Sequence, residues 1–128
     1  MMRFHDGRRA ALVVVLGCLL AGQALAAGDV ARGGDVFDSE CSDCHSLKAG
    51  KNRKGPSLFA VVGRASASQP EYNYSDVLRK THWTWTPEQI DVYIKLPKAS
   101  VPGGRMKYDG LADAGKRADV IAFLSTIK

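Results

Sequence analysis

The pattern of apolar and polar positions is helical rather than sheet-like. Val30, Gly33, Phe37 and Cys41 are separated by 3, 4 and 4 positions, which is the period of one helix face. Asp29 precedes them and belongs to the residue types that cap helix N-termini. No stretch alternates with period 2 for long enough to predict a strand. The first helix is therefore expected to begin directly after Asp29.

Two further helices are predicted downstream. A strong helix start is formed by Thr86, Pro87 and Gln89. Threonine can cap the helix N-terminus, and proline lacks only an N–H that the first turn does not use. Glutamine can complete a capping box with the threonine. This helix is expected to stop at Pro97. The last helix is expected over residues 113–127, where apolar residues recur at i, i+3, i+4 and i+7.

The segments between these helices are expected to be loops. Residues 46–73 and 101–110 lack sustained periodicity and are rich in glycine and proline. Long loops cannot cover much apolar surface by themselves and in a small domain are usually functional or disordered. A hydrophobic content of 45% argues against disorder. We therefore expect an all-α fold of three or four helices with something other than protein at its centre.

The first residues of the chain read as an export signal. Three arginines among the first nine residues precede an apolar run over 10–20, and residues 24–26 have the spacing Ala-x-Ala. This order is typical of a secretory leader. We predict a cleavable signal peptide over 1–26 and a single domain over 27–128. Two alternatives remain open, an uncleaved membrane anchor and a lipid on Cys18.

Composition excludes several classes of protein. Without the leader, the chain carries 15 basic and 12 acidic side chains and no basic run, which argues against nucleic-acid binding. Only Cys41 and Cys44 remain, so the chain is not a disulfide-dense secreted scaffold. An exported chain of this kind is expected in the bacterial periplasm.

The run Cys41-Ser42-Asp43-Cys44-His45 indicates the chemistry. The spacing C-x-x-C-H is typical of covalent haem attachment, in which each thiol forms a thioether with the porphyrin and the histidine reaches the iron. A structural zinc site would need a fourth ligand. A redox-active C-x-x-C would need a βαβ context. Both alternatives are weaker than haem.

The second axial position of a haem iron has three candidate states. Met106 is the only methionine outside the leader and follows a loop rich in proline and glycine. His82 is the only other histidine outside the leader, and the position can also stay open. Met106 can alternatively fill a gap in an apolar core.

Further residues extend the haem motif into a resemblance. From about Gly28 to the C-terminus, the chain resembles a class I cytochrome c of the mitochondrial or bacterial periplasmic kind. The matching residues are Gly28-Asp29-Val30, Gly33, Phe37, Cys41, Cys44-His45, Gly55-Pro56-Ser57-Leu58, Gly63-Arg64, Tyr74, Trp85, Tyr93, Pro102-Gly103, Met106 and Asp119-Val120-Ile121-Ala122-Phe123-Leu124.

The resemblance implies a small cytochrome c fold, all-α, with long loops wrapped around one covalently bound haem c. It implies that His45 and Met106 are the axial iron ligands and that the Pro56 carbonyl orients His45. It also implies that Arg64, Tyr74 and Trp85 bind a haem propionate, and the set of expected cofactor-binding residues includes Tyr93. The first and last helices should cross where Gly33 and Phe37 meet Val120 and Phe123. Gly104 departs from the family pattern, which has threonine there.

The resemblance further implies a soluble, monomeric one-electron carrier that is not an enzyme. Its expected partners are redox proteins with acidic docking faces: quinol–cytochrome c reductase, a terminal oxidase, a reaction centre or a periplasmic dehydrogenase. The basic residues expected around the haem edge are Lys51, Arg53, Lys98, Arg105 and Lys107. If Met106 binds iron weakly, the alternatives are a haem peroxidase or a gas sensor. A haem domain bound permanently to a larger oxidoreductase is a further alternative.

Overall fold

The structure is a computed structural model that describes residues 27–128, so the predicted leader lies outside the described residues. The helices are α1 (Val30–Glu40), α2 (Asp76–Arg79), α3 (Pro87–Lys95), α4 (Pro97–Ser100) and α5 (Ala114–Leu124). Apart from one isolated bridge between Ala65 and Thr84, this part of the chain has no β-structure. The all-α prediction is confirmed. None of the described helices is both long and apolar enough to span a bilayer.

The predicted starts of the three longer helices are confirmed by their caps. The side chains of Asp29, Thr86 and Asp113 each accept a hydrogen bond from the backbone N–H three residues later. Each bond satisfies one of the amide donors that a helix leaves free in its first turn. The last helix ends at Leu124, slightly before the expected boundary at residue 127.

Two short helices differ from the sequence prediction. Pro97 does follow the end of α3, but it also begins α4, because a proline ring suits the first position of a new helix. Helix α2 was not predicted, since four residues are too few to show a periodic pattern. Its N-cap Ser75 accepts a hydrogen bond from the backbone N–H of Leu78.

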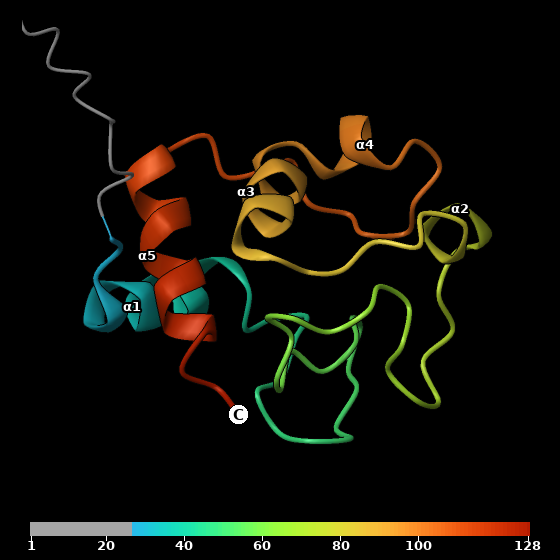
Figure 1. Cartoon of the computed structure of the whole chain (residues 1–128), viewed down its shortest axis with the longest axis horizontal. Coiled ribbons are helices and arrows are strands. Elements are labelled where there is room, and N and C mark those ends of the chain that lie inside the picture. The colour runs from blue at the N-terminus through green and yellow to red at the C-terminus, as the bar shows by residue number, and fades with distance from the viewer. Residues whose placement is uncertain (1–26) are drawn as a thin grey trace, which may run out of the picture.

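Helices α1 and α5 cross at one end of the molecule, whereas α2 and the long loops form the other end (Figure 1). A Cβ at Gly33 would overlap the backbone carbonyl of Asp119, so the helices approach this closely only with glycine there. The rings of Phe37 and Phe123 lie 5.8 Å apart at the crossing. Val120 is fully buried beside them, at 1% exposure. The expected crossing is therefore present.

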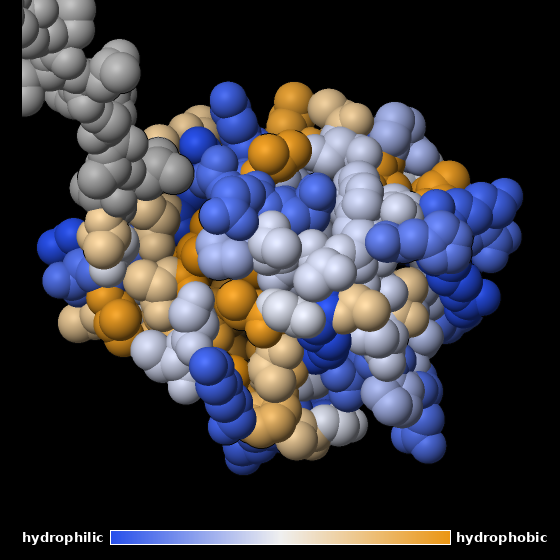
Figure 2. Space-filling model, viewed as in Figure 1, coloured by the Kyte–Doolittle hydropathy of each residue, from blue (hydrophilic) through white to orange (hydrophobic). Residues whose placement is uncertain are grey.

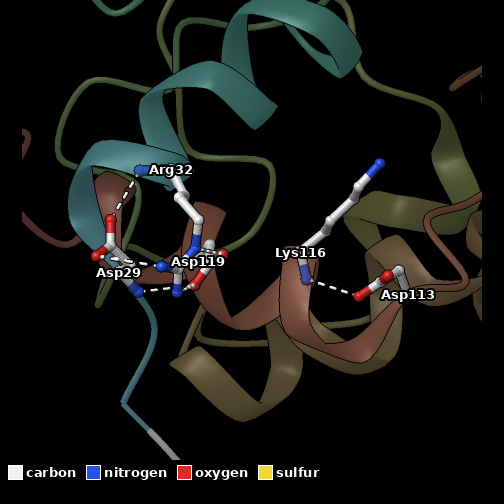
Figure 3. A network of polar contacts seen from close by, with 5 residues as sticks. All are labelled: Asp29, Arg32, Asp113, Lys116 and Asp119. Carbon is white, nitrogen blue, oxygen red and sulfur yellow. Dashed lines mark hydrogen bonds and ion pairs between the residues drawn. The ribbon is translucent and has the colours of Figure 1, made fainter.

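A network of hydrogen bonds and ion pairs links the start of α1 to α5 (Figure 3). The backbone N–H of Asp29 donates to one carboxylate oxygen of Asp119 over 2.7 Å, and Arg32 Nε donates to the other over 2.9 Å. The Arg32 bond, followed by that from Asp29, lowers the pKa of Asp119 below its usual value. Ionised Asp119 thus stabilises the fold at neutral pH, and this contribution is lost as the pH falls through the lowered pKa.

Candidate functional site

A cavity of about 390 Å³ lies between α3, α5 and the loops. Nine aliphatic residues line it: Leu58, Val61, Leu78, Ile90, Ile94, Val101, Leu111, Val120 and Leu124. In Figure 2, hydrophobic residues gather at the α1, α3 and α5 side of the face shown, and hydrophilic residues at the α2 end. An apolar cavity of this size with a few polar groups in its wall is typical of a cofactor or small-molecule site.

All nine residues expected to bind the cofactor line this one cavity. They are Cys41, Cys44, His45, Pro56, Arg64, Tyr74, Trp85, Tyr93 and Met106. His82 is exposed and does not line the cavity. Among the described residues, no group of three or more His, Cys, Asp or Glu side chains is placed to hold a metal ion. The gathering of all nine expected residues at one cavity is the arrangement that the resemblance implied.

The turn after α1 presents both thiols to the cavity. The backbone N–H groups of Cys44 and His45 donate to the Cys41 carbonyl over 3.1 and 3.0 Å, which folds the motif into one tight turn. Neither thiol is in a disulfide. Burial raises the pKa of the Cys41 thiol to about 11. Redox-active C-x-x-C thiols have lowered pKa values, so this site is unlike a reactive dithiol.

His45 is held in the form that can bind a metal. Its Nδ1 lies 2.7 Å from the carbonyl oxygen of Pro56, the partner that the resemblance implied. Because a carbonyl can only accept, Nδ1 carries the proton and Nε2 keeps its lone pair. Burial lowers the pKa of His45, which also favours the neutral imidazole. A Cβ at Gly55 would overlap the imidazole ring, so this position requires glycine.

Arg64 supplies an unused donor to the cavity wall. Its terminal nitrogens donate to the carbonyls of Phe59 and Ser57 and to the Gln69 side chain, at 2.7 to 2.9 Å. Its Nε has no partner, and it is the one such buried side-chain nitrogen or oxygen in the described part of the chain. A buried unpaired donor is costly. This part of the cavity wall is therefore suited to a ligand that has an anionic hydrogen-bond acceptor.

The hydroxyl group of Tyr74 is a second available hydrogen-bond donor on the cavity wall. Its oxygen accepts a hydrogen bond from the Gln69 N–H over 3.0 Å, which leaves the O–H free to donate. Burial raises the pKa of Tyr74, so the phenol keeps that proton at neutral pH. Together with Arg64, it makes this part of the wall complementary to a carboxylate.

The bridge at Ala65 and Thr84 places Arg64 beside Trp85. Trp85 N–H donates to the Arg64 carbonyl over 2.8 Å. Trp83 packs outside the wall, with its ring centre 5.9 Å from that of Trp85 and 6.3 Å from that of Tyr93. The sequence analysis missed Trp83. The alternation Trp-Thr-Trp was a usable signal, since residues i and i+2 of an extended segment share a face.

Met106 is half-buried and lines two neighbouring cavities. It lines the main cavity and also a second cavity of about 50 Å³, which Tyr93 and Gly104 share. Tyr108, two residues later, lines the main cavity and donates to Glu40 Oε2 over 2.7 Å. Burial, and then this bond, raise the pKa of Tyr108 far above its usual value.

Comparisons with known proteins agree with this geometry. Residues 30–128 match the family model for cytochrome c. Cytochrome c2 of Rhodopila globiformis is 46% identical over 101 residues, which are 79% of this chain and 95% of that protein. Cytochrome c2 of Rhodomicrobium vannielii is 40% identical over 121 residues, which are 92% of this chain and 96% of that protein. Among solved structures, cytochrome cH from Methylobacterium extorquens is similar with a TM-score of 0.73 and 37% identity, covering 77% of this chain and 99% of that one. The chain therefore belongs to the cytochrome c family and has its small all-α fold.

Proposed function

We propose that this protein is a one-electron carrier whose haem c is bound through Cys41 and Cys44 and ligated by His45 and Met106. The observation that supports it most is that one apolar cavity is lined by both thiols, His45 and Met106. His82, the competing ligand candidate, lies outside that cavity. When bound, haem c supplies a reversible one-electron couple between its ferrous and ferric states.

The surrounding residues hold and tune that couple. His45, fixed by Pro56, would be one ligand of the haem iron. The soft thioether of Met106 would be the other and would favour the ferrous state. The aliphatic residues of the wall would disfavour the additional charge of the ferric state. With both residues bound, the iron would have no place for a substrate, which is why we propose a carrier and not an enzyme.

Arg64, Tyr74 and Trp85 are proposed to bind a haem propionate. The unpaired Nε of Arg64 and the free O–H of Tyr74 are donors on the wall of the same cavity. A carboxylate there would satisfy the buried guanidinium and would itself escape the cost of an unpaired buried charge.

The proposed partners are redox proteins with acidic faces. The proposed location is the periplasm, and residues 1–26 would direct export of the chain to it.

The structure changes which basic residues are available for contact with such partners. Lys98 donates to Asp109 over 2.6 Å, and Arg105 donates to the Asn73 carbonyl over 2.7 Å. Lys107 lines the cavity, is exposed, and forms no hydrogen bond or ion pair through its side chain with the described residues 27–128. Docking is therefore proposed to depend on Lys107 more than on Lys98.

Lys107→Glu is expected to slow association with an acidic partner several-fold at low salt and to flatten its salt dependence. Salt screens exposed charges beyond about 8 Å at physiological ionic strength. Stopped-flow kinetics at several salt concentrations measure the rate. Lys128→Glu, an equal charge change away from the cavity wall, is the control. Equal effects of the two variants would mean that overall charge, and not this site, directs docking.

Carbon monoxide distinguishes the carrier from its alternatives. With Met106 bound to iron, the ferrous protein should bind almost no carbon monoxide at neutral pH, and the ferric protein should show the weak thioether-to-iron absorption band. A peroxidase or gas sensor with an open site would bind carbon monoxide and lack that band. Visible spectra of both oxidation states, with and without the gas, decide between them.

A further inference from the structure

The segment that carries Met106 is held by side chains. Residues 105–110 take part in no backbone–backbone hydrogen bond, whereas the bonds on either side join Gly104 to Val101 and Leu111 to Ile94. At Gly104, no hydroxyl is available to anchor the segment. Its position therefore depends on the side-chain bonds that its own residues make.

Three such bonds leave the segment, and they are not equivalent. Lys98 and Asp109 are 64% and 95% exposed, and exposed ion pairs contribute little. Arg105 is also exposed where it donates to the Asn73 carbonyl. Tyr108 differs in being half-buried and lining the cavity, and it donates over 2.7 Å to the carboxylate of Glu40, which is itself exposed. Hydrogen bonds to charged groups are stronger than neutral ones.

The Tyr108 bond also joins the two halves of the site. Its acceptor, Glu40, is the last residue of α1 and directly precedes Cys41. The two partners are 68 positions apart in the sequence, and both line the cavity. One bond thus links the segment that carries Met106 to the segment that carries the attachment motif.

We propose that Tyr108 is a positioning residue, whose hydrogen bond to Glu40 holds Met106 against the haem iron and keeps the distal side of the cavity closed. This inference rests on the proposed function, because it concerns the Met106 ligand. Small ligands that compete with Met106 can bind only when the segment moves away. Loss of the bond is therefore expected to admit them more readily while leaving the haem attached.

The test uses imidazole as the competing ligand of the ferric holoprotein. Tyr108→Phe and Glu40→Ala are each expected to raise imidazole affinity about 5-fold, equivalent to about 1 kcal/mol, with earlier loss of the thioether-to-iron band. Glu40→Gln keeps an acceptor and should restore most of the wild-type affinity. The double variant Tyr108→Phe, Glu40→Ala should exceed neither single variant, as expected for one shared interaction.

Tyr72→Phe is the matched control. Tyr72 also lines the cavity and donates its hydroxyl, but to the Lys54 carbonyl, which does not belong to the segment over 105–110. Its imidazole affinity should stay within about 2-fold of wild type, less than 0.5 kcal/mol on the same scale. Hydrogen–deuterium exchange supplies a readout independent of ligand binding. The amides of Gly104 and Leu111, whose hydrogen bonds flank the segment, should exchange faster in Tyr108→Phe, and those of α5 should not.

The outcomes separate the two proposals. A wild-type protein that lacks the thioether-to-iron band refutes ligation by Met106 and this inference with it. If the band is present but Tyr108→Phe matches the wild type in imidazole affinity, the inference is wrong and the proposed function stands. Faster exchange without a change in imidazole affinity also overturns it, because the bond would then order the segment without holding Met106.

Discussion

Met106→Ala is expected to lower the reduction potential of the protein, open the iron to small molecules and create peroxidase activity. In the proposed ligation the half-buried thioether of Met106 would favour the ferrous state, and alanine would leave water or nothing in its place. The drop should be on the order of 100 to 200 mV, within the roughly 0.8 V that axial ligands span. Redox titration followed by absorbance measures it, together with carbon monoxide binding and guaiacol oxidation in peroxide.

Met106→His serves as the control for an open site. Its imidazole should also lower the potential but should keep the iron closed, so this variant should gain little peroxidase activity. His82→Ala removes the competing ligand candidate, which is exposed and outside the cavity, and should leave the potential unchanged. A normal potential in Met106→Ala combined with a lowered one in His82→Ala would reverse the ligand assignment.

Replacing Cys41 and Cys44 together by alanine is expected to release the haem and leave little folded protein. An apolar cavity of about 390 Å³ would be left unfilled. An ordinary domain is stabilised by only about 5–15 kcal/mol, so loss of the group that fills this cavity should leave little folded protein. Extraction with acidified organic solvent measures covalent attachment, and circular dichroism during heating measures folding.

Single replacements distinguish attachment from folding. Cys44→Ala keeps one thioether, so haem should remain with the chain and the fold should survive with reduced stability. Ser42→Ala changes the residue between the thiols, whose hydroxyl donates to the Asp38 carbonyl, and should retain both thioethers. Cooperative unfolding of the haem-free double variant at wild-type stability would contradict the view that the cofactor supplies the core.

Interactions between close neighbours in the chain were predictable from the sequence. The caps at Asp29, Thr86 and Asp113 bond to residues three positions away. The arrangement of Cys41 and His45 is likewise a local property of the chain, because a single turn brings both residues to the same cavity. The resemblance added the more distant residues, and the structure brings the nine that were expected to bind the cofactor to one cavity.

Interactions between distant residues were decided only by the tertiary structure. The sequence gives no sign that Tyr108 donates to Glu40, that Lys98 is paired with Asp109, or that Arg64 keeps one donor unpaired. Each of these features depends on which loops come together around the cavity, and no local periodicity of the sequence predicts that arrangement. The sequence alone determined the three longer helices and the attachment motif. The tertiary structure decided which side chains pair with one another around the cavity, because hydrogen bonds and ion pairs depend on distances that only packing sets.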